Sequence, residues 1–221
     1  CSSDLVSNFS YSHMKIKGKS KSLAEGEFYP IKSLVDDEVL EVIKKYRKQV
    51  AGRYQAVTSS NIEMVLIHAP FKVSPKVDGE LWFLVVDSDG PPVLCAPNGR
   101  VISGSLPILD EAADMLSGQK QRLILAGELY VLAEEGRPRV GMVSSMLASG
   151  KKAEVDRLGF MAFDLVEATE VPDNYDERFE AIDKMIGKGK RCQLIKTETC
   201  EDIEGVQKLY DEWVEGGKAE G

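Results

Sequence analysis

Apolar residues recur every three or four positions after residue 38, and this period predicts an amphipathic helix. A carboxylate at Asp36 or Asp37 stands where a helix N-cap belongs, and Gly52 follows the last apolar position. The apolar face consists of Val39, Val42, Ile43, Tyr46 and Val50. The same period predicts further helices over residues 108–116, 174–186 and 203–213.

Short apolar runs between turn residues dominate from residue 62 onward, and they predict strands. Two segments between such runs, Ser88-Asp89-Gly90 and Asn98-Gly99, are typical of hairpin turns. Strand pairs interleaved with isolated helices indicate an α+β fold with largely antiparallel sheets flanked by helices. The predicted strands cover residues 62–69, 80–87, 93–96, 122–132, 158–166 and 190–197.

The first thirty residues are polar, and four lysines alternate with other residues in their second half. In a strand this spacing would place all four ammonium groups on one face, as in an arm that binds phosphate. The alternative, which we favour, is a solvated tail. The lysines are Lys15, Lys17, Lys19 and Lys21. We expect residues 1–60 to form an N-terminal extension with one helix, and residues 61–221 to form the main domain.

The composition is that of an ordinary globular protein. The 221 residues include 28 Lys and Arg against 36 Asp and Glu, a net charge of −8, and 43% of them are hydrophobic. These values exclude a disordered, collagen-like or disulfide-based protein. No apolar run approaches the roughly 18 residues of a membrane helix, so no membrane partner is expected. The acidic balance argues against wrapping nucleic acid over the whole surface, but it permits a local basic groove.

The cysteines are spaced too widely for a zinc ribbon or a redox pair, and only His13 and His68 are available to join them in a metal site. We therefore expect reduced thiols and histidines without a chemical role. The four cysteines are Cys1, Cys95, Cys192 and Cys200. Because the chain begins with Cys1 and not with Met, we expect a fragment; the alternative is the mature start of a lipidated envelope protein.

Lys76 is the basic residue with the most suggestive surroundings, because Pro75-Lys76-Val77-Asp78-Gly79-Glu80 joins two predicted strands. Such a turn presents an amine at a sheet edge, with a carboxylate nearby and a backbone that bends sharply at Gly79. Nucleophilic attack needs the neutral amine, so burial or a nearby positive charge must lower its pKa. The alternative is a surface lysine in an ordinary Asp-Gly hairpin turn.

Three further segments follow Lys76 in order. Glu128 is the single acidic residue of the apolar strand segment Leu125-Ala126-Gly127-Glu128-Leu129-Tyr130, where a buried carboxylate needs a partner. Phe163 precedes Asp164 in another predicted strand, and Glu220 stands directly before Gly221. The plainer alternatives are a Glu128 that faces water from an edge strand and a Phe163 that only packs in the core.

This ordered set resembles the covalent nucleotidyltransferases, the superfamily of DNA ligases, RNA ligases and messenger-RNA capping enzymes. Its motifs are Lys-x-Asp-Gly, an apolar strand with Gly-Glu, an aromatic-Asp strand and a segment that begins with Glu-Gly. The match runs from about residue 62 to residue 221, and it includes a segment similar to the family's Tyr-x-Glu-Arg at Tyr175, Glu177 and Arg178. The resemblance implies the ATP-grasp-like fold of a ligase adenylation domain.

The resemblance also implies a role for each motif residue. Lys76 would attack the α-phosphate of ATP, release pyrophosphate and hold AMP, while Asp78 and Gly79 would shape the lysine turn. Phe163 would stack on the adenine ring. Glu128 would contact the ribose or help to bind the metal, and Glu220 would assist the catalytic Mg²⁺ or Mn²⁺. Phosphoryl transfer relies mainly on positioning and charge stabilisation, which such a cation supplies.

The chain departs from the family pattern at three places. Many DNA ligases carry Arg two residues after the motif glycine, whereas Leu81 stands there, as in one branch of RNA ligases. The family's Ser-Arg-x-Gly loop aligns with Ala96-Pro97-Asn98-Gly99, so its phosphate-binding arginine is missing, although Arg100 lies close. The residues end at Glu220-Gly221, before the fifth motif and the usual OB-fold domain, so we expect an incomplete adenylation domain.

Other chemistry-bearing residues have plain interpretations. Trp82 and Trp213 are expected to pack, one on a strand and the other on the last helix. Lys151 and Lys152 precede the Phe163 strand, and we expect a solvated charge pair there; contact with a nucleic-acid backbone is the alternative.

The sequence therefore predicts an ATP-dependent polynucleotide ligase, with RNA favoured over DNA on the basis of Leu81. Its partners would be ATP and nicked or single-stranded nucleic-acid ends, and we expect a monomer in the cytoplasm, nucleoid or nucleus. The alternatives are a GTP-dependent capping guanylyltransferase, an NAD-dependent ligase, and a nucleotide- or nucleic-acid-binding module without catalysis.

Overall fold

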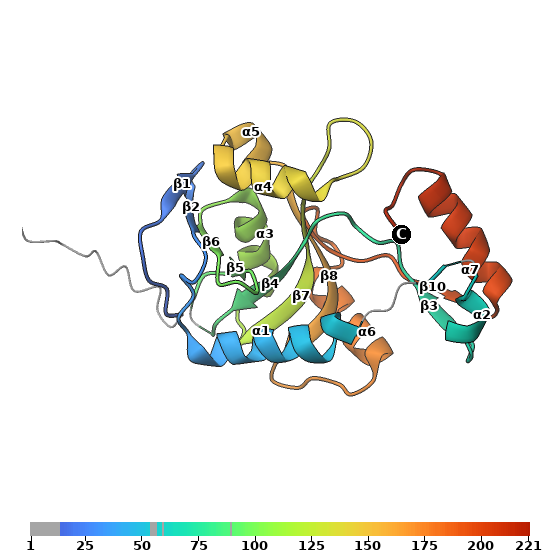
Figure 1. Ribbon diagram of the computed structural model, residues 1–221. Helices are drawn as coiled ribbons and strands as arrows, with labels where there is room; N and C mark the ends of the chain where they lie inside the picture. The colour runs from blue at the N-terminus through green and yellow to red at the C-terminus, as the bar shows by residue number, and fades with distance from the viewer. Residues whose placement is uncertain (1–13, 54–56, 59, 89) are drawn as a thin grey trace, which may run out of the picture.

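An eight-stranded sheet forms the body of the protein in the computed structural model, which describes residues 14–53, 57–58, 60–88 and 90–221 (Figure 1). Neighbouring strands are antiparallel except β8 and β9, which are parallel. This confirms the predicted α+β fold. In spatial order the strands are β1 (Lys21–Leu23), β2 (Gly26–Tyr29), β6 (Val101–Gly104), β5 (Val93–Cys95), β4 (Glu80–Val86), β7 (Leu123–Val131), β8 (Leu158–Glu167) and β9 (Cys192–Leu194).

A smaller lobe lies at one end of this sheet, on the right of Figure 1. Its two-stranded sheet pairs β3 with β10, and α7 contacts both strands. The C-terminus also lies at this lobe (Figure 1). The elements of the small lobe are β3 (Phe71–Val73), β10 (Glu198–Cys200), α2 (Ile62–Val65), α7 (Ile203–Tyr210) and the π-helix η2 (Asp211–Glu215).

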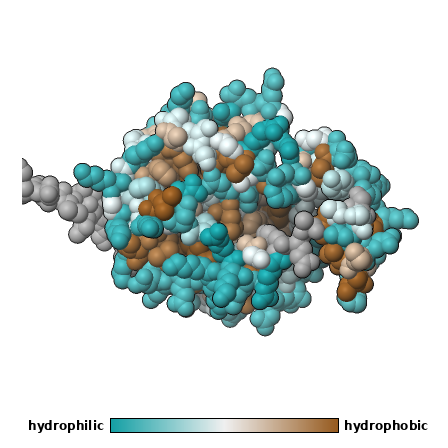
Figure 2. Space-filling view, in the orientation of Figure 1, coloured by the Kyte–Doolittle hydropathy of each residue, from teal (hydrophilic) through white to brown (hydrophobic). Residues whose placement is uncertain are grey.

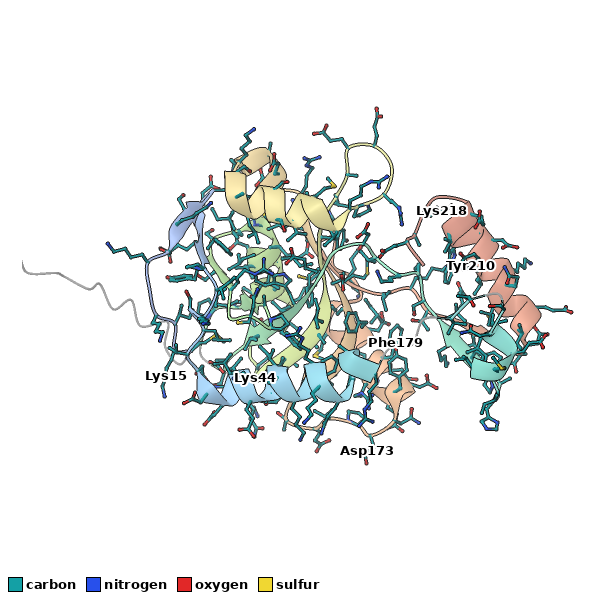
Figure 3. The ribbon with its side chains drawn as sticks, in the orientation of Figure 1. Lys15, Lys44, Asp173, Phe179, Tyr210 and Lys218 are labelled. Atoms are coloured by element: carbon teal, nitrogen blue, oxygen red, sulfur yellow. The ribbon has the colours of Figure 1, made fainter. Side chains whose placement is uncertain are left out.

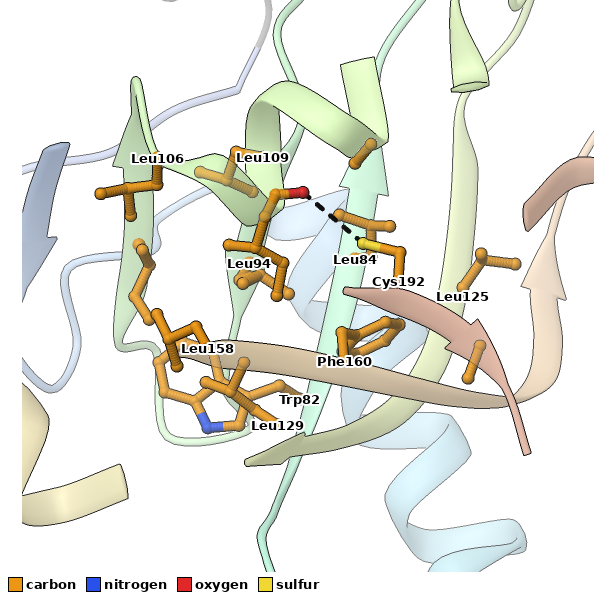
Figure 4. Close-up of a cluster of buried hydrophobic side chains, with 14 of the residues drawn as sticks. Trp82, Leu84, Leu94, Leu106, Leu109, Leu125, Leu129, Leu158, Phe160 and Cys192 are labelled. Carbon is orange, nitrogen blue, oxygen red and sulfur yellow. Dashed lines mark hydrogen bonds between the residues drawn. The ribbon is translucent and has the colours of Figure 1, made fainter. Parts of the chain in front are cut away.

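Helices cover both faces of the main sheet, and the alternation along β4 shows how the sequence separates the two faces. Trp82 and Leu84 point into the larger apolar cluster, which Figure 4 shows in close-up, whereas Phe83 and Val85 point into the cluster beneath α1 (Asp37–Gln49). The larger cluster includes residues from α3 (Pro107–Leu116), α4 (Val140–Ser149), α5 (Lys152–Val155) and α6 (Tyr175–Ile186). Trp82 is fully buried, which confirms its predicted packing role.

The helix predicted after residue 38 is confirmed as α1. The Asp36 carboxylate accepts a hydrogen bond from the backbone N–H of Val39 at 3.2 Å, so it caps the helix as expected. Val39, Ile43 and Tyr46 are buried against the sheet. The helix ends at Gln49, and the short 3₁₀ turn η1 (Ala51–Arg53) follows it.

The segment before residue 60, which the sequence set apart as an extension, contributes β1, β2 and α1 to the main sheet and its core. The described lysines at 15, 17, 19 and 21 are all exposed, but the strand predicted for them is wrong, because only Lys21 lies in β1. Gly18 adopts a left-handed conformation, with φ of +96°, and this interrupts the extended backbone. Residues 1–13, including His13, lie outside the described part of the chain.

Two other strand predictions need correction. Residues 62–69 form the short helix α2 and irregular backbone, because a short apolar run does not distinguish a helix from a strand. Met64, Val65 and Ile67 are exposed, and Figure 2 shows apolar surface on the lobe that contains them. The strand predicted over 190–197 is limited to Cys192–Leu194, since the chain then crosses to the small lobe.

Several elements were not predicted at all, among them β6, the β1–β2 hairpin and α4. In α4 only Val143, Met146 and Leu147 are buried, and glycines at 141 and 150 lie in and after the helix, so its apolar stripe is short. The turn at Asn98-Gly99 is confirmed, with Gly99 at φ +81° between β5 and β6. Asp89 of the other predicted turn lies outside the described residues.

Candidate active site

Lys76 lies in the connection between β3 and β4, where the chain crosses from the small lobe to the main sheet. Its backbone N–H donates to the carbonyl of Gly221 at 2.6 Å, and the backbone N–H of Glu220 donates to the carbonyl of Lys76 at 3.1 Å. The Lys76 ammonium group also contacts the Glu220 carboxylate, 144 residues further along the chain. Backbone and side chain therefore hold these two predicted site residues together.

Glu128 faces the same region from β7. It pairs with Leu81 of β4 and Met161 of β8. Burial raises its pKa to about 7, because desolvation outweighs the nearby Lys76 charge and a hydrogen bond from the Gly79 backbone, both of which lower it. The neighbouring carboxylates of Glu220 and Asp78 raise the pKa further. The alternative interpretation, a carboxylate that faces water on an edge strand, is wrong, since β7 lies between β4 and β8.

The turn after Lys76 rests directly on β7 at Gly79. A Cβ atom at this position would lie 2.3 Å from the carbonyl oxygen of Leu129 and 2.9 Å from Cγ of Glu128, so a glycine is needed for the close approach. Asp78 accepts a hydrogen bond from the backbone N–H of Val140, the first residue of α4, at 3.1 Å. The motif residues Asp78 and Gly79 thus position the turn on the main lobe.

Phe163 lies on the same sheet face as Glu128. The β7–β8 register shifts between Ala126 and Gly127, where β8 contains one additional residue, and Phe163 packs against the cluster beneath α1. Since Met161 is opposite Glu128, the Phe163 side chain lies one side-chain step further along this face. The phenyl ring is only partly buried, which leaves part of it accessible to a ligand.

Asp164, beside Phe163, is buried and fully bonded. Its carboxylate accepts hydrogen bonds from the Tyr46 hydroxyl at 3.1 Å and from Nε of Arg178 at 2.9 Å. Arg178 also stacks over the ring of Tyr175 at 5.9 Å, so two residues of the Tyr-x-Glu-Arg segment support the Phe163 strand. Glu177 is exposed. The sequence did not predict the contribution of Tyr46, whose only signal was its place on the apolar face of a helix.

The comparison with protein families identifies this arrangement. The family model described as ATP dependent DNA ligase domain matches residues 48–221. The chain belongs to the ATP-dependent DNA ligase family. A search of the curated proteins found no match to the sequence.

Solved structures show the same fold. Pmar-Lig_Pre. and Pmar-Lig_PreS3 are each similar to this ligase domain with a TM-score of 0.56 and 18% sequence identity, over 79% and 80% of this chain. The matches cover 44% and 45% of those two chains, so the ligase domain spans less than half of their length. The ATP-dependent DNA ligase from bacteriophage T7, in complex with ATP, is 17% identical, with a TM-score of 0.47, over 74% of this chain and 59% of its own.

A hollow of about 560 Å³ adjoins the lysine turn of the ligase domain. Pro75 and Val77, on either side of Lys76, line it together with Met161 of β8 and Phe179 of α6. Figure 3 shows Phe179 at the side of the main lobe that faces the small lobe. Lys76, Glu128 and Phe163 themselves are not among its lining residues, so the hollow borders their cluster.

Arg100 does not supply the phosphate-binding arginine that the 96–99 loop lacks. Its Nη2 atom lies 2.5 Å from the Glu80 carboxylate, and its guanidinium stacks over the Trp82 ring at 5.0 Å. Both partners belong to the sheet face opposite Glu128, because side chains alternate along β4. In the ligase domain this arginine is already engaged on the wrong face.

Other residues singled out from the sequence have structural surroundings. Trp213 is buried, as predicted, and Lys196 stacks over its ring at 5.6 Å. Lys152 pairs with Glu25 on the surface, and Lys151 is exposed, in keeping with solvated charges. His68 is also exposed. The described cysteines are all free thiols: Cys95, Cys192 and Cys200.

Within residues 14–221, apart from the gaps named above, no group of three His, Cys, Asp or Glu side chains is arranged to hold a metal ion alone. Glu128 and Glu220 nevertheless lie within electrostatic range of one another. Mg²⁺ commonly takes one or two carboxylates from a protein and completes its shell with water and substrate phosphates. The two carboxylates therefore fit a cation that arrives with a nucleotide. In the same described residues, no helix has the length and apolarity needed to span a membrane.

Proposed function

We propose that the ligase domain forms a covalent lysyl-AMP intermediate at Lys76 and passes the AMP to the 5′-phosphate of a nucleic-acid end. The observation that carries the proposal is the cluster of the Lys76 ammonium with the Glu220 carboxylate, next to the largely buried Glu128. An amine between two acceptors, on a turn held by backbone contacts, is suited to nucleophilic catalysis.

The first step is a displacement at the α-phosphorus of ATP. The neutral Nζ of Lys76 attacks this phosphorus, an N–P bond forms, and the bond to the bridging oxygen breaks, so pyrophosphate leaves with the electron pair. The nitrogen loses a proton as the bond forms. In the second step an oxygen of the 5′-phosphate attacks the same phosphorus, the N–P bond breaks, and Nζ regains a proton. Attack by the 3′-hydroxyl then seals the strand and releases AMP.

Glu128 is our candidate for the residue that receives the lysine proton. Its raised pKa of about 7 arises mainly from burial, so the carboxylate is poised to accept a proton near neutral pH. Glu220 is the more exposed of the two carboxylates, and it contacts the ammonium form of Lys76 directly. We therefore assign Glu220 to hold the lysine before reaction and Glu128 to accept the proton during it.

Glu128 and Glu220 are also the residues that would hold a divalent cation together with the phosphates of ATP. When bound, such a cation would neutralise charge on the transferring phosphoryl group. Asp78 and Gly79 keep the turn against β7 and α4, which fixes the height of Lys76 above the sheet.

Phe163 is our candidate for the surface on which the adenine base stacks. It lies one step along the sheet face from the Glu128–Met161 pair, and its ring is partly accessible. The hollow beside Pro75 and Val77 has a volume typical of small-molecule sites, so the base has room at the border of the cluster.

DNA is the substrate that the family match favours. Leu81 pairs with Glu128 across β4 and β7 and packs against the cluster beneath α1, so it lies at the site itself. An apolar side chain at this position was the reason to favour RNA. We propose DNA as the substrate, with RNA ends as the competing case in the assay.

The experiment incubates the full-length natural protein with α-labelled ATP, GTP or NAD and Mg²⁺, and follows label on the protein. We expect label from ATP that Lys76→Ala abolishes and that Lys151→Ala, which changes an exposed lysine, leaves intact. Ligation of nicked DNA and of RNA ends then ranks the two polymers.

Each other outcome is also informative. Label from GTP alone would identify a capping-type enzyme, and label from NAD alone would identify an NAD-dependent ligase. Nucleotide binding without label would favour a non-catalytic module. Label that persists in Lys76→Ala would overturn the assignment of the nucleophile.

A further inference from the structure

The loop between β7 and α4 carries two arginines that the proposed reaction has not used. It follows β7, which contains Glu128, and it ends at α4, whose first N–H is bonded to Asp78. Figure 1 shows the beginning of α4 beside the connection that contains Lys76. Arg137 and Arg139 are the last basic residues before the helix, so the loop brings their backbone to the edge of the candidate active site.

Arg137 is a partly buried guanidinium with an unmet hydrogen-bonding requirement. Its Nη1 atom is enclosed and has no hydrogen-bond partner among the described residues. A buried donor without an acceptor is costly, and in native proteins it usually indicates a missing partner such as a ligand, an ion or water. The geometry of a guanidinium suits phosphate oxygens in particular.

The carboxylates of the loop do not satisfy either arginine. Glu134 pairs with Arg157 at 3.2 Å, and no ion pair is found for Glu135 in the described chain. Arg139 is exposed and makes no side-chain hydrogen bond there, although it occupies the N-cap position of α4. By contrast, four other arginines each pair with a carboxylate: Arg100, Arg122, Arg157 and Arg178.

The first turn of α4 adds to the positive potential at this place. It contains no acidic residue, and its N-cap side chain makes no capping hydrogen bond. Asp78 takes only the N–H of Val140. The exposed N–H groups of a helix N-terminus favour anions, and here they adjoin two unpaired guanidinium groups.

The in-line geometry of phosphoryl transfer explains why one anion site would serve two ligands. Attacking and leaving groups lie on opposite sides of the phosphorus. Pyrophosphate therefore leaves from the side opposite Lys76 in the first step, and the 5′-phosphate attacks from that same side in the second. The carboxylates at Asp78, Glu128 and Glu220 repel both anions, so a source of positive charge nearby is required.

We infer that Arg137 and Arg139 form the phosphate site that holds pyrophosphate in the first step and the 5′-phosphate of the nucleic acid in the second. These residues take the place of the arginine missing from the 96–99 loop. The inference rests on the proposed lysyl-AMP chemistry at Lys76. It names the residues that bind the group opposite Lys76 in both displacements.

The test uses preformed lysyl-AMP on the full-length protein, so that the two steps are measured apart. Pyrophosphate is titrated to drive the release of ATP, and a 5′-phosphorylated nick is added separately to drive the transfer of AMP in a single turnover. The variants are Arg137→Gln, Arg139→Gln and the double variant. The matched control is Arg47→Gln, which removes the same charge from an exposed, unpaired arginine on α1.

We expect the double variant to raise the half-saturating pyrophosphate concentration and to slow AMP transfer, each by about tenfold or more, as the loss of charge-assisted hydrogen bonds implies. Arg137→Lys should recover only part of both effects, because lysine lacks the planar fork. Thermal unfolding checks that Arg137→Gln still folds, and the exposed Arg139→Gln should be unaffected in stability.

Effects no larger than those of Arg47→Gln in both steps would overturn the inference. A change confined to one of the two steps would overturn it as well, because the site is assigned to both anions. These outcomes differ from a failure of the proposed function, in which the unmodified protein itself would form no lysyl-AMP.

Discussion

The Tyr46 hydroxyl of α1 donates a hydrogen bond to Oδ2 of Asp164 at 3.1 Å, across 118 residues of sequence. The same carboxylate accepts from Arg178, and its residue is only 9% exposed. Asp164 directly follows Phe163 at the point where β8 contains one additional residue relative to β7. A helix near the beginning of the described chain thus fixes the strand that presents the candidate adenine-stacking ring.

Tyr46→Phe tests this support. The change removes one hydrogen bond to a buried carboxylate, so we expect the free energy of unfolding to fall by about 1–3 kcal/mol. Urea unfolding measures this loss, and Tyr210→Phe, at a tyrosine that is 45% exposed, is the control. An unchanged unfolding free energy would show that water replaces the hydroxyl without cost.

Phe163→Ala separates stacking from packing. If the ring stacks on adenine, the variant should weaken ATP binding by roughly 1–3 kcal/mol, the usual contribution of one base stacked on an aromatic ring. Calorimetric titration with ATP measures the affinity, and urea unfolding measures the stability. A destabilised variant with unchanged ATP affinity would instead support the plain core interpretation.

Gly79→Ala should disturb the lysine turn. The added methyl group would meet the Leu129 carbonyl at 2.3 Å, so we expect a loss of about 1–3 kcal/mol in stability, as for other overpacked sites, and a slower formation of lysyl-AMP. Gly141→Ala is the matched control, because a Cβ there meets nothing within 4 Å and the residue lies inside α4. That variant should gain roughly 0.5–1 kcal/mol, and equal behaviour of the two would refute the contact.

Glu128 makes a prediction about pH. Its pKa is about 7 in the folded protein against an ordinary value of 4.5, mainly because it is buried. Between these values the folded protein holds a proton that the unfolded chain has released, so the contribution of Glu128 to stability falls as the pH rises from about 4.5 to above 7. Urea unfolding at pH 5 and pH 8 should show a smaller loss in Glu128→Gln than in the unmodified protein. Parallel losses would mean that Glu128 titrates normally.

Local patterns predicted much of the fold and part of the site. The spacing of Val39, Ile43 and Tyr46, with Asp36 before them, was sufficient for α1, since capping and amphipathicity are properties of adjacent residues. The order of Lys76 and Glu128 along the chain identified two residues that lie close together in the structure.

Other features depend on tertiary contacts that no local pattern records. The additional residue in β8 depends on pairing with β7, and the bond from Tyr46 to Asp164 joins residues 118 apart. Arg100 lay close in sequence to a family motif, but the alternation of side chains along β4 places its partners, Glu80 and Trp82, on the other face. The exposed apolar residues of α2 misled the strand prediction, because burial was inferred from hydrophobicity alone.

The backbone pairing of Lys76 with Glu220 and Gly221 has a mechanical consequence. Residues 218 and 219 are themselves bonded to Trp213 of the small lobe, whereas Gly79, three positions after Lys76, rests on the main sheet. The lysine is therefore the clasp between two bodies, and any hinge-like movement of one against the other must twist its own peptide. Closure of the lobes would aim the amine, and opening them would turn it aside.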